Sequence, residues 1–532
     1  MATVKEATYD LLREHGITTM FGNPGSTELP MLADFPDDFR YVLGLQEAVV
    51  VGMADGFAQA SGKPGFVNLH TAPGVGNAMG GIFNAQANHS PLVITAGQQA
   101  RSLMTLQANL TNRDATRMVH PLVKWSYEPP RAEDVPHAIA RAIHAASLPP
   151  KGPAFVSIPM DDWQAEVDAD AVKHVTARTV DGIAGATEGA ITDLAAQLES
   201  AKAPVMVAGP DIDASGAWEL AIMLAEKQKL PVWASPAPGG GRIGFPENHQ
   251  NFRGILPPAI GPLGETLAPY DFVLVVGASV FAYYPNIPGP LLPEGTQLVA
   301  ITSDPDEAQR APMGDAIVAD VRVTLGQLVD AVTESDREAP EAQWPPPDPE
   351  QMDPPNPSAI VQALADVWPA DGIAVVESPS ATLALRNRLK LSKPGSWYFG
   401  AGGGLGFGLS AAVGVQMAEP DRPVVCVIGE GSVQYAVQAF WTAAAYDVPL
   451  TVLVLRNEEY AILKWFAGLE QVEGAPGLDL PRLESAQLAA SYGVSARQTT
   501  GIDDTREALR EAIGSGKPEL VEVRVSPGMA LF

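Results

Sequence analysis

The sequence contains little cysteine and comparatively few basic residues. A single cysteine, Cys426, excludes an intrachain disulfide, and its apolar surroundings favour a buried position in a reducing cytoplasm. Lysine and arginine number 34 against 62 acidic residues, which gives a net charge of -28 at pH 7 and a pI near 4.6. Nucleic acid and anionic membranes would repel such a chain, so we expect neither as a partner.

Long hydrophobic runs are also missing. No apolar stretch reaches the ~18 residues of a membrane span, and the start, Met1–Ala7, has no charged-then-apolar signal. We therefore expect a protein that stays in the cytoplasm where it is made. Its 532 residues, of which 46% are hydrophobic, leave room for about three globular domains.

Apolar, strand-like runs alternate with helix-like runs along most of the chain, which predicts an α/β fold of three doubly wound domains with mostly parallel sheets. We expect the domains at 1–182, 183–340 and 358–532. The stretch 341–357 is rich in proline and acid, so it predicts a linker. No glycine fingerprint of the dinucleotide-binding type follows a strand in the second domain.

The most informative stretch begins where an apolar run, Pro423–Ile428, stops at the acidic turn Gly429–Gly431. A 3.6-residue pattern over 435–444 then predicts one helix, and Pro449–Leu455 predicts the next strand. Since the carboxyl ends of neighbouring parallel strands share one edge, Glu430 and Asn457 should lie together. Such oxygen ligands suit Mg²⁺ bound with a diphosphate.

Three further loops, at 21–30, 45–48 and 67–74, each follow or end an apolar segment. They carry Ser26, Glu47 and His70, which would converge at the carboxyl edge of the first sheet. Turn chemistry, a solvated glutamate and a structural histidine are the alternative explanations when each is taken alone.

Together these motifs resemble the thiamine diphosphate (ThDP) enzymes, and in particular the 2-oxo acid decarboxylases of the benzoylformate decarboxylase type. The resemblance rests on the order of Ser26, Glu47, His70, the run Gly402–Phe407 and the acidic turn, and it covers essentially the whole chain. The metal motif departs from the family signature, because Glu430 replaces the usual aspartate and Arg456 the first of two asparagines.

The resemblance implies catalytic roles for four residues. The carboxyl group of Glu47 would hydrogen-bond the cofactor's aminopyrimidine in an apolar pocket, so that the cofactor loses its C2 proton. Ser26 would hold the substrate carboxylate and His70 would transfer protons, as an imidazole does near neutral pH. Tyr284 stands where relatives have a second histidine. Because its hydroxyl is a poorer proton shuttle at pH 7, turnover would be slower or the substrate different.

The remaining implied site residues bind cofactor, metal or substrate. The diphosphate would contact Ser380 and Ser432, the aminopyrimidine would bond the carbonyl of Gly403, and Leu405 would support the bent cofactor. Leu463 and Phe466 would pack against an aromatic substrate side chain, with core packing as the alternative. The metal ligands would be Glu430, Asn457 and the backbone carbonyl of Glu459, with Mg²⁺ or alternatively Ca²⁺ as the ion.

Three functions fit these features. The first is decarboxylation of an aromatic 2-oxo acid, most directly benzoylformate to benzaldehyde and CO₂. The second is a carboligase or lyase acting on 2-hydroxy ketones with the same cofactor. The third is an inactive ThDP-like regulatory or structural subunit, for which the altered metal motif is the best support. The resemblance further implies a cofactor site between two subunits, hence at least a homodimer and commonly a homotetramer.

Overall fold

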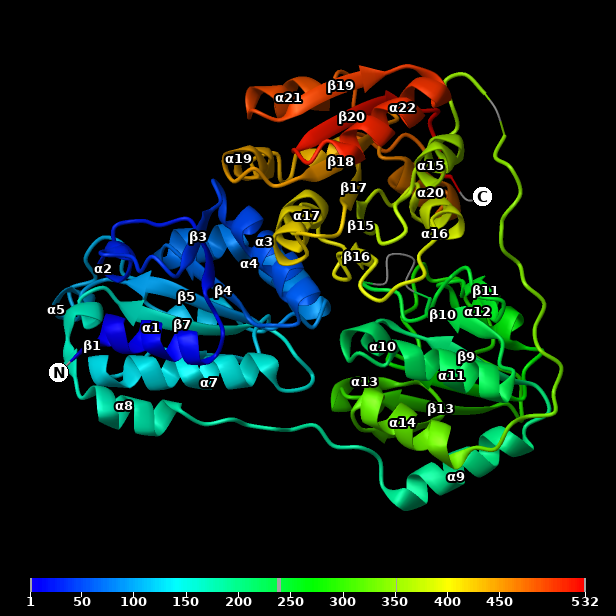
Figure 1. Ribbon diagram of the computed structural model, residues 1–532, viewed down its shortest axis with the longest axis horizontal. Helices are drawn as coiled ribbons and strands as arrows, with labels where there is room; N and C mark the ends of the chain where they lie inside the picture. Colours follow the sequence, from blue (N-terminus) through cyan, green and yellow to red (C-terminus); the bar gives the residue numbers. More distant parts are fainter. Residues whose placement is uncertain (1, 237–240, 351, 531–532) are drawn as a thin grey trace.

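The structure, a computed structural model, describes residues 2–236, 241–350 and 352–530. Three six-stranded sheets, each with purely parallel pairing, form three lobes that follow one another along the chain (Figure 1). Helices cover the sheets, so the predicted α/β architecture of three doubly wound units is confirmed. A short antiparallel pair, β1 (Ala2–Thr3) with β8 (Glu166–Val167), stands apart from them.

The first sheet has the order β3-β2-β4-β5-β7-β6. Its strands are β2 (Thr19–Gly22), β3 (Arg40–Leu43), β4 (Gly65–Leu69), β5 (Leu92–Gln98), β6 (Trp125–Tyr127) and β7 (Ala154–Pro159). Its longer helices are α1 (Val4–Glu14), α3 (Glu47–Ser61), α4 (Thr71–Ala87) and α7 (Val135–Ser147), and the shorter ones are α2 (Leu29–Leu32), α5 (Arg101–Met104), α6 (Ala115–Met118) and α8 (Ala169–Thr176).

The central sheet has the order β11-β10-β9-β12-β13-β14. Its strands are β9 (Pro204–Ala208), β10 (Val232–Ala234), β11 (Phe252–Ile255), β12 (Phe272–Val276), β13 (Gln297–Thr302) and β14 (Asp315–Val318). Its helices are α9 (Glu188–Ser200), α10 (Pro210–Ala214), α11 (Trp218–Gln228), α12 (Ile260–Leu267), α13 (Pro305–Arg310) and α14 (Val321–Ala331).

The third sheet has the order β16-β15-β17-β18-β20-β19. Its strands are β15 (Ile373–Glu377), β16 (Trp397–Phe399), β17 (Val424–Gly429), β18 (Leu450–Arg456), β19 (Ser495–Thr499) and β20 (Glu519–Arg524). Its helices are α15 (Pro357–Ala365), α16 (Thr382–Arg388), α17 (Phe407–Ala418), α18 (Glu430–Val433), α19 (Ala439–Ala445), α20 (Ala461–Leu469), α21 (Ser485–Ser491) and α22 (Gly501–Gly514).

One sequence-based element is wrong. The single helix predicted after the acidic turn is two short helices, α18 and α19, because the chain turns over 434–438. Tyr435 consequently lies half exposed instead of on a buried helical face. The strands on either side are confirmed, and so is the burial of Cys426 within β17. The proline-rich stretch has no helix or strand among its described residues before α15 begins at Pro357.

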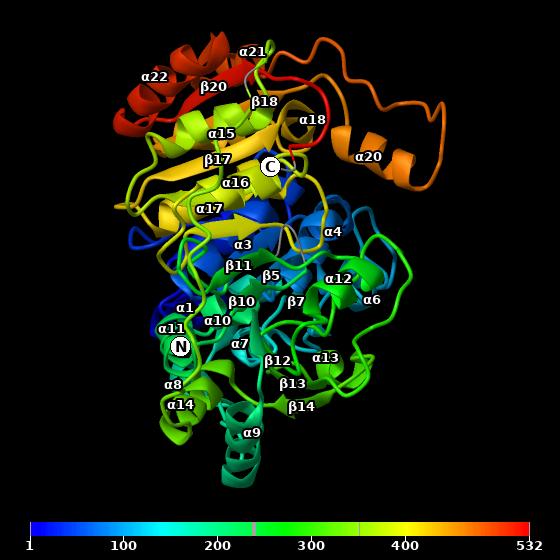
Figure 2. The same ribbon diagram turned by 90° about the vertical axis from the view of Figure 1, so that its right-hand side faces the viewer.

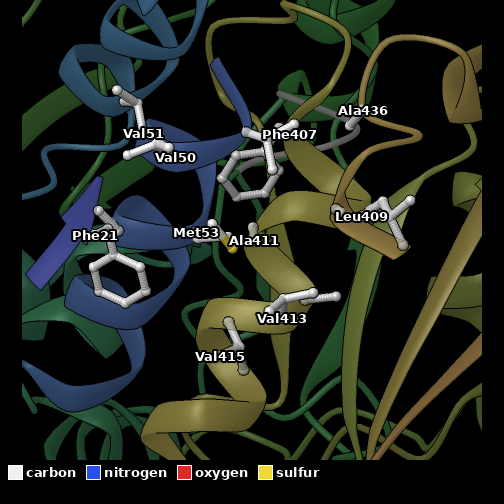
Figure 3. Packing of buried hydrophobic residues seen from close by; sticks show 14 of the residues in the cluster. Phe21, Val50, Val51, Met53, Phe407, Leu409, Ala411, Val413, Val415 and Ala436 are labelled. Carbon is white, nitrogen blue, oxygen red and sulfur yellow. The ribbon is translucent and has the colours of Figure 1, made fainter. Parts of the chain in front are cut away.

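The first and third domains pack through α3 and α17, whose apolar side chains share one buried cluster (Figure 3). Glycines let the two helices come very close: a Cβ added at Gly56 would stand 2.2 Å from the carbonyl oxygen of Ala411, and one at Gly414 1.9 Å from that of Met53. Any larger residue at either position would push the helices apart, and with them the two domains.

A buried ion pair in the central domain makes hydrogen bonds to both of the other domains. Arg242 bonds Asp213 at 2.8 Å and donates to the carbonyl of Gln59 in the first domain at 2.8 Å. Asp213 also accepts the backbone N–H of Gly395 in the third domain at 3.0 Å. Figure 2 shows α20 extending away from the rest of the chain. None of the helices in the described ranges combines the length and apolar character that a membrane span needs.

Candidate active site

Several of the predicted site residues, among them Ser26, His70 and Glu430, follow strands at points where the strand order reverses. In the first sheet the chain leaves β2 for β3 on one side and resumes at β4 on the other; in the third sheet it does so between β15 and β17. Ligands of doubly wound sheets bind at such switch points, beyond the carboxyl ends of the strands. The loops after β2 and β4 carry Ser26 and His70, and the turn after β17 carries Glu430.

His70 is oriented by a carboxylate that the sequence analysis passed over, Glu28. The carboxylate is 1% exposed, and its Oε2 lies 2.8 Å from Nδ1 of His70. Three other donors reach it: the backbone N–H of Gly25 at 2.8 Å, that of Gly97 at 2.9 Å and the hydroxyl of Thr27 at 2.6 Å. Because an ionised carboxylate only accepts, Nδ1 of His70 carries the donated hydrogen and Nε2 is left for other partners.

The backbone around His70 is constrained as well. A Cβ added at Gly25 would lie 2.1 Å from Nδ1 of the imidazole, so only glycine allows this close approach. Thr71, which begins α4 directly after His70, has a φ of 40°. A β-branched residue pays about 1–3 kcal/mol in such a conformation, and strain of this kind is concentrated at functional sites.

Glu47 lies at the start of α3 and is 9% exposed. Buried valines follow it along the helix, as expected, and two asparagine side chains reach the carboxylate itself. Asn23 donates to Oε1 at 3.3 Å and Asn77 to Oε2 at 3.0 Å. Asn23 belongs to the turn-like run after β2, and Asn77 lies on α4. Donors on both oxygens fix the direction of the carboxyl group.

In the third domain, Glu430 and the loop that carries Asn457 meet as predicted. Glu430 is 1% exposed, and its Oε1 accepts the backbone N–H of Glu458 at 2.6 Å. Burial raises its pKa to about 7, although backbone donors from Glu458 and Asn457 act in the opposite direction. A bound cation would supply the positive charge that a buried carboxylate favours, so this residue fits the metal role.

Arg456, whose charge helps to lower the pKa of Glu430, makes its own contacts elsewhere. Its guanidinium donates to Glu522 on β20 at 2.9 Å and lies 3.4 Å from Glu484. The side chain of Glu459 pairs with Lys464 and accepts the backbone N–H of Gly528 at 2.7 Å, which leaves the predicted role to its backbone carbonyl. Among the described residues, no group of three or more histidine, cysteine or acidic side chains is arranged to hold an ion.

The glycine-rich run after β16 forms a loop that leads into α17. Gly403 and Gly406 have φ values of 73° and 100°, which side chains rarely adopt. Leu405 lines a small cavity with Ala48 of α3. Glu377, the last residue of β15, reaches beneath the loop, and burial raises its pKa to about 8 against three backbone donors that lower it.

The predicted hydroxyl groups differ in exposure. Ser26 is exposed in the turn before α2, two residues from Glu28. Ser432 is 7% exposed on α18, directly after the acidic turn, and Ser380 is half-buried after β15 at the switch point of the third sheet. Ser380 and Ser432 therefore both lie at the carboxyl edge of the third sheet, whereas Ser26 lies at the carboxyl edge of the first sheet.

Two of the predicted substrate-pocket residues, Leu463 and Phe466, lie on α20. Tyr284 of the central domain is 67% exposed, and its ring centroid is 4.8 Å from that of Phe466. Trp465 lies 4.9 Å from Phe466 in turn, and Leu463 is 46% exposed on the same helix. Phe466 and Tyr284, from different domains, thus form an aromatic pair on the surface of the chain. A buried-core role for Leu463 does not agree with this exposure.

Sequence reasoning missed Glu28, Asn77 and Glu377. Glu28 stands within the run 21–30 that was noticed, and Glu377 in the segment that contains Ser380. Two buried carboxylates at the carboxyl ends of apolar strands are a usable signal, since burying an acid is costly unless donors surround it. A cleft where the three domains meet, lined among others by His89, Asp211 and Ala401, contains none of the predicted site residues.

A cofactor-binding α/β enzyme of three doubly wound domains is the class that this fold indicates. Comparison with protein families makes it specific. Residues 2–118 match the thiamine pyrophosphate enzyme N-terminal TPP-binding domain, 191–328 the central domain and 380–523 the C-terminal TPP-binding domain. The chain belongs to the thiamine pyrophosphate enzyme family.

Individual relatives are similar over their whole length. A benzoylformate decarboxylase of Pseudomonas aeruginosa is 49% identical over 98% of this chain and 99% of its own. Among solved structures, a ThDP-dependent 4-hydroxybenzoylformate decarboxylase of Rhodococcus jostii is 46% identical, covers 99% of both chains and has a TM-score of 0.96. A benzoylformate decarboxylase of Polynucleobacter necessarius is 39% identical, covers 100% of both and also has a TM-score of 0.96.

Proposed function

We propose that the chain is a decarboxylase of aromatic 2-oxo acids, with benzoylformate as the first candidate and benzaldehyde and CO₂ as products. The observation that carries the proposal is the 49% identity to a benzoylformate decarboxylase across 98% of the chain. Relatives named acetolactate synthases are only 26–28% identical, so the comparisons support decarboxylation over carboligation. The ordered contacts of His70 and Glu47 support an active enzyme over an inactive subunit.

In this proposal the first domain supplies the groups that handle protons. Glu47, fixed by Asn23 and Asn77, would hydrogen-bond the aminopyrimidine of ThDP. His70, held by Glu28 through Nδ1, would present Nε2 to the reacting substrate and exchange a proton there. Ser26, exposed in the neighbouring turn, would hold the substrate carboxylate. The bound cofactor would supply the carbon nucleophile and the electron sink.

The third domain would hold the other end of the cofactor. Glu430, Asn457 and the carbonyl of Glu459 would bind Mg²⁺, or alternatively Ca²⁺, and Ser380 and Ser432 would contact the diphosphate. The buried carboxylate of Glu430, whose Oε1 already bonds the loop of Asn457, supports this assignment. Gly403 and Leu405 would receive the aminopyrimidine.

The aromatic residues Tyr284 and Phe466, with Leu463, would surround the ring of the substrate. Their exposure on one chain supports a site that is completed by a second subunit, hence a homodimer at least and a homotetramer by family analogy. The domain boundaries near 182, 340 and 357 and the cytoplasmic location remain our predictions.

The test is product release by the purified protein supplied with ThDP and Mg²⁺. We expect benzaldehyde and CO₂ from benzoylformate at a higher kcat/KM than acetaldehyde from pyruvate. Equal or better turnover of pyruvate would contradict an aromatic pocket while leaving the cofactor assignment intact. No turnover of either substrate by protein that binds ThDP would contradict decarboxylation itself.

A further inference from the structure

The side chain of Glu377 is hydrogen-bonded to the end of the glycine-rich loop 402–407. This carboxylate is 4% exposed, and its two oxygens accept different backbone N–H groups: Oε1 that of Gly406 at 2.6 Å and Oε2 that of Gly408 at 2.9 Å. The N–H of Phe407 is a further donor toward it. Glu377 thereby accepts hydrogen bonds from the N–H groups at the start of α17, which have no partner within the helix.

Asn84 of α4, in the first domain, is hydrogen-bonded to the same loop. Its amide nitrogen donates to the carbonyl of Gly404 at 2.8 Å, and its oxygen accepts the N–H of Gly404 at 3.0 Å. The side-chain amide thus bonds both the N–H and the carbonyl of one residue, as a neighbouring strand does in a β-sheet. Asn84 is 3% exposed, and a Cβ added at Gly402 would come within 2.8 Å of its Oδ1.

Leu405 lies between the two held residues, Gly404 and Gly406, and Gly403 directly precedes Gly404. Glycine backbones sample many conformations, and ordering one residue costs roughly 1–2 kcal/mol of conformational entropy. A loop with glycine at four of its six positions, 402–404 and 406, would therefore be poorly ordered without such contacts. The direction of the Gly403 carbonyl therefore depends on Asn84, which holds the adjacent Gly404, and on Glu377, which fixes the end of the loop from Gly406 onward.

We propose that Asn84 and Glu377 are positioning residues that hold the glycine-rich loop 402–407 in the shape that receives the aminopyrimidine of ThDP. The proposal rests on the ThDP-dependent function proposed above and extends it to residues that need not touch the cofactor. Asn84 acts across the boundary between the first and third domains, so the first domain would shape a cofactor contact presented by the third.

Isosteric substitutions separate this role from simple packing. In Glu377→Gln, either orientation of the new amide turns its NH₂ group toward a backbone N–H, since Gly406 and Gly408 donate to different oxygens. In Asn84→Asp, the donor to the carbonyl of Gly404 is lost and a negative oxygen faces that carbonyl. Both variants retain the size of the native side chain.

The experiment is equilibrium binding of ThDP to the purified full-length variants at saturating Mg²⁺, followed by tryptophan fluorescence or calorimetry. We expect Kd to rise about tenfold or more in each variant, which corresponds to about 1.4 kcal/mol. At saturating ThDP, KM for benzoylformate should stay within about twofold of wild type. The matched control is Glu199→Gln, whose carboxylate accepts the N–H of Thr333 at 2.6 Å in the central domain; its ThDP affinity should not change.

Thermal melting of each cofactor-free variant measures folding separately. Variants that melt earlier yet bind ThDP with wild-type Kd per folded molecule would overturn the proposal, because the residues would then be merely structural. Should Glu377→Gln fail to fold, Asn84→Asp carries the test alone. Wild-type protein that does not bind ThDP would refute the proposed function, whereas wild-type binding with unchanged variants would refute only the positioning role.

Discussion

Glu28→Gln is the substitution whose consequences the structure determines most fully. All four partners of the carboxylate can donate: Gly97 and Thr27 meet Oε1, whereas Gly25 and His70 meet Oε2. A glutamine has one acceptor oxygen, so its NH₂ group must face a backbone N–H whichever way the amide is turned. One buried N–H is then left unsatisfied, which costs about 1–3 kcal/mol of the free energy of unfolding.

The effect on catalysis comes through His70. If the amide turns its NH₂ toward Nδ1, the imidazole must accept there and carry its hydrogen on Nε2, which reverses the tautomer presented to substrate. If the oxygen stays at Nδ1, a charge-assisted hydrogen bond worth about 1.5–3 kcal/mol becomes a neutral one. Since proton transfer by a positioned group contributes about 10²–10⁴-fold, we expect kcat to fall about 10²-fold.

The assay is benzaldehyde formation from benzoylformate at saturating ThDP and Mg²⁺, with urea unfolding of the cofactor-free protein measured in parallel. Glu199→Gln, an acid-to-amide change at another carboxylate that caps a backbone N–H, serves as the control and should keep wild-type kcat. A folded Glu28→Gln variant with kcat within about twofold of wild type would refute the claim that Glu28 orients a catalytic histidine.

Four further outcomes are expected. Glu47→Gln should reduce kcat at least about 10²-fold in a protein that still folds, and unchanged turnover would remove Glu47 from the catalytic residues. His70→Ala should lower kcat far more than ThDP affinity; if neither changes, His70 is a structural residue. Tyr284→Phe keeps the ring contact with Phe466 and should lower kcat about tenfold at constant KM if the hydroxyl transfers a proton, whereas equal kcat would assign the ring to packing alone. The free energy of unfolding of the cofactor-free protein should fall as pH rises from about 6.5 to 8. Burial raises the pKa of Glu377 to about 8, so over this range the folded state keeps a proton that the unfolded chain has released. For His89, burial lowers the pKa but Asp211 raises it, to about 9 in all. The charged imidazole therefore stabilises the folded state at low pH, and this contribution is lost as pH rises toward 9. Urea titrations at pH 6, 7, 8 and 9 measure this slope, and stability that increases over that range would contradict it.

The strands were predictable because buried parallel strands are short, nearly continuous apolar runs. The predicted runs Pro423–Ile428 and Pro449–Leu455 match β17 and β18 to within one residue at each end. The meeting of Glu430 with the loop of Asn457 follows from the topology alone. The helix after Glu430 was wrong because its apolar spacing does not distinguish one continuous helix from two short ones joined by a turn.

The supporting contacts of the site could not be predicted, because they join residues far apart in the chain. Glu28 meets His70 across 42 positions, and Asn84 meets Gly404 across 320. Local patterns carry no information about such pairs. Within its own run, Glu28 is indistinguishable from a solvated turn residue, and only burial among donors identifies it as the partner of the histidine.

The central claim is ThDP-dependent, non-oxidative decarboxylation, and product stoichiometry tests it most directly. Protein stripped of metal and cofactor is given benzoylformate, and CO₂ and benzaldehyde are counted before and after ThDP and Mg²⁺ are added. We predict no products beforehand and, afterwards, one CO₂ and one benzaldehyde for each benzoylformate consumed. Release that is independent of ThDP, or CO₂ accompanied mainly by coupled 2-hydroxy ketone instead of aldehyde, would contradict the account.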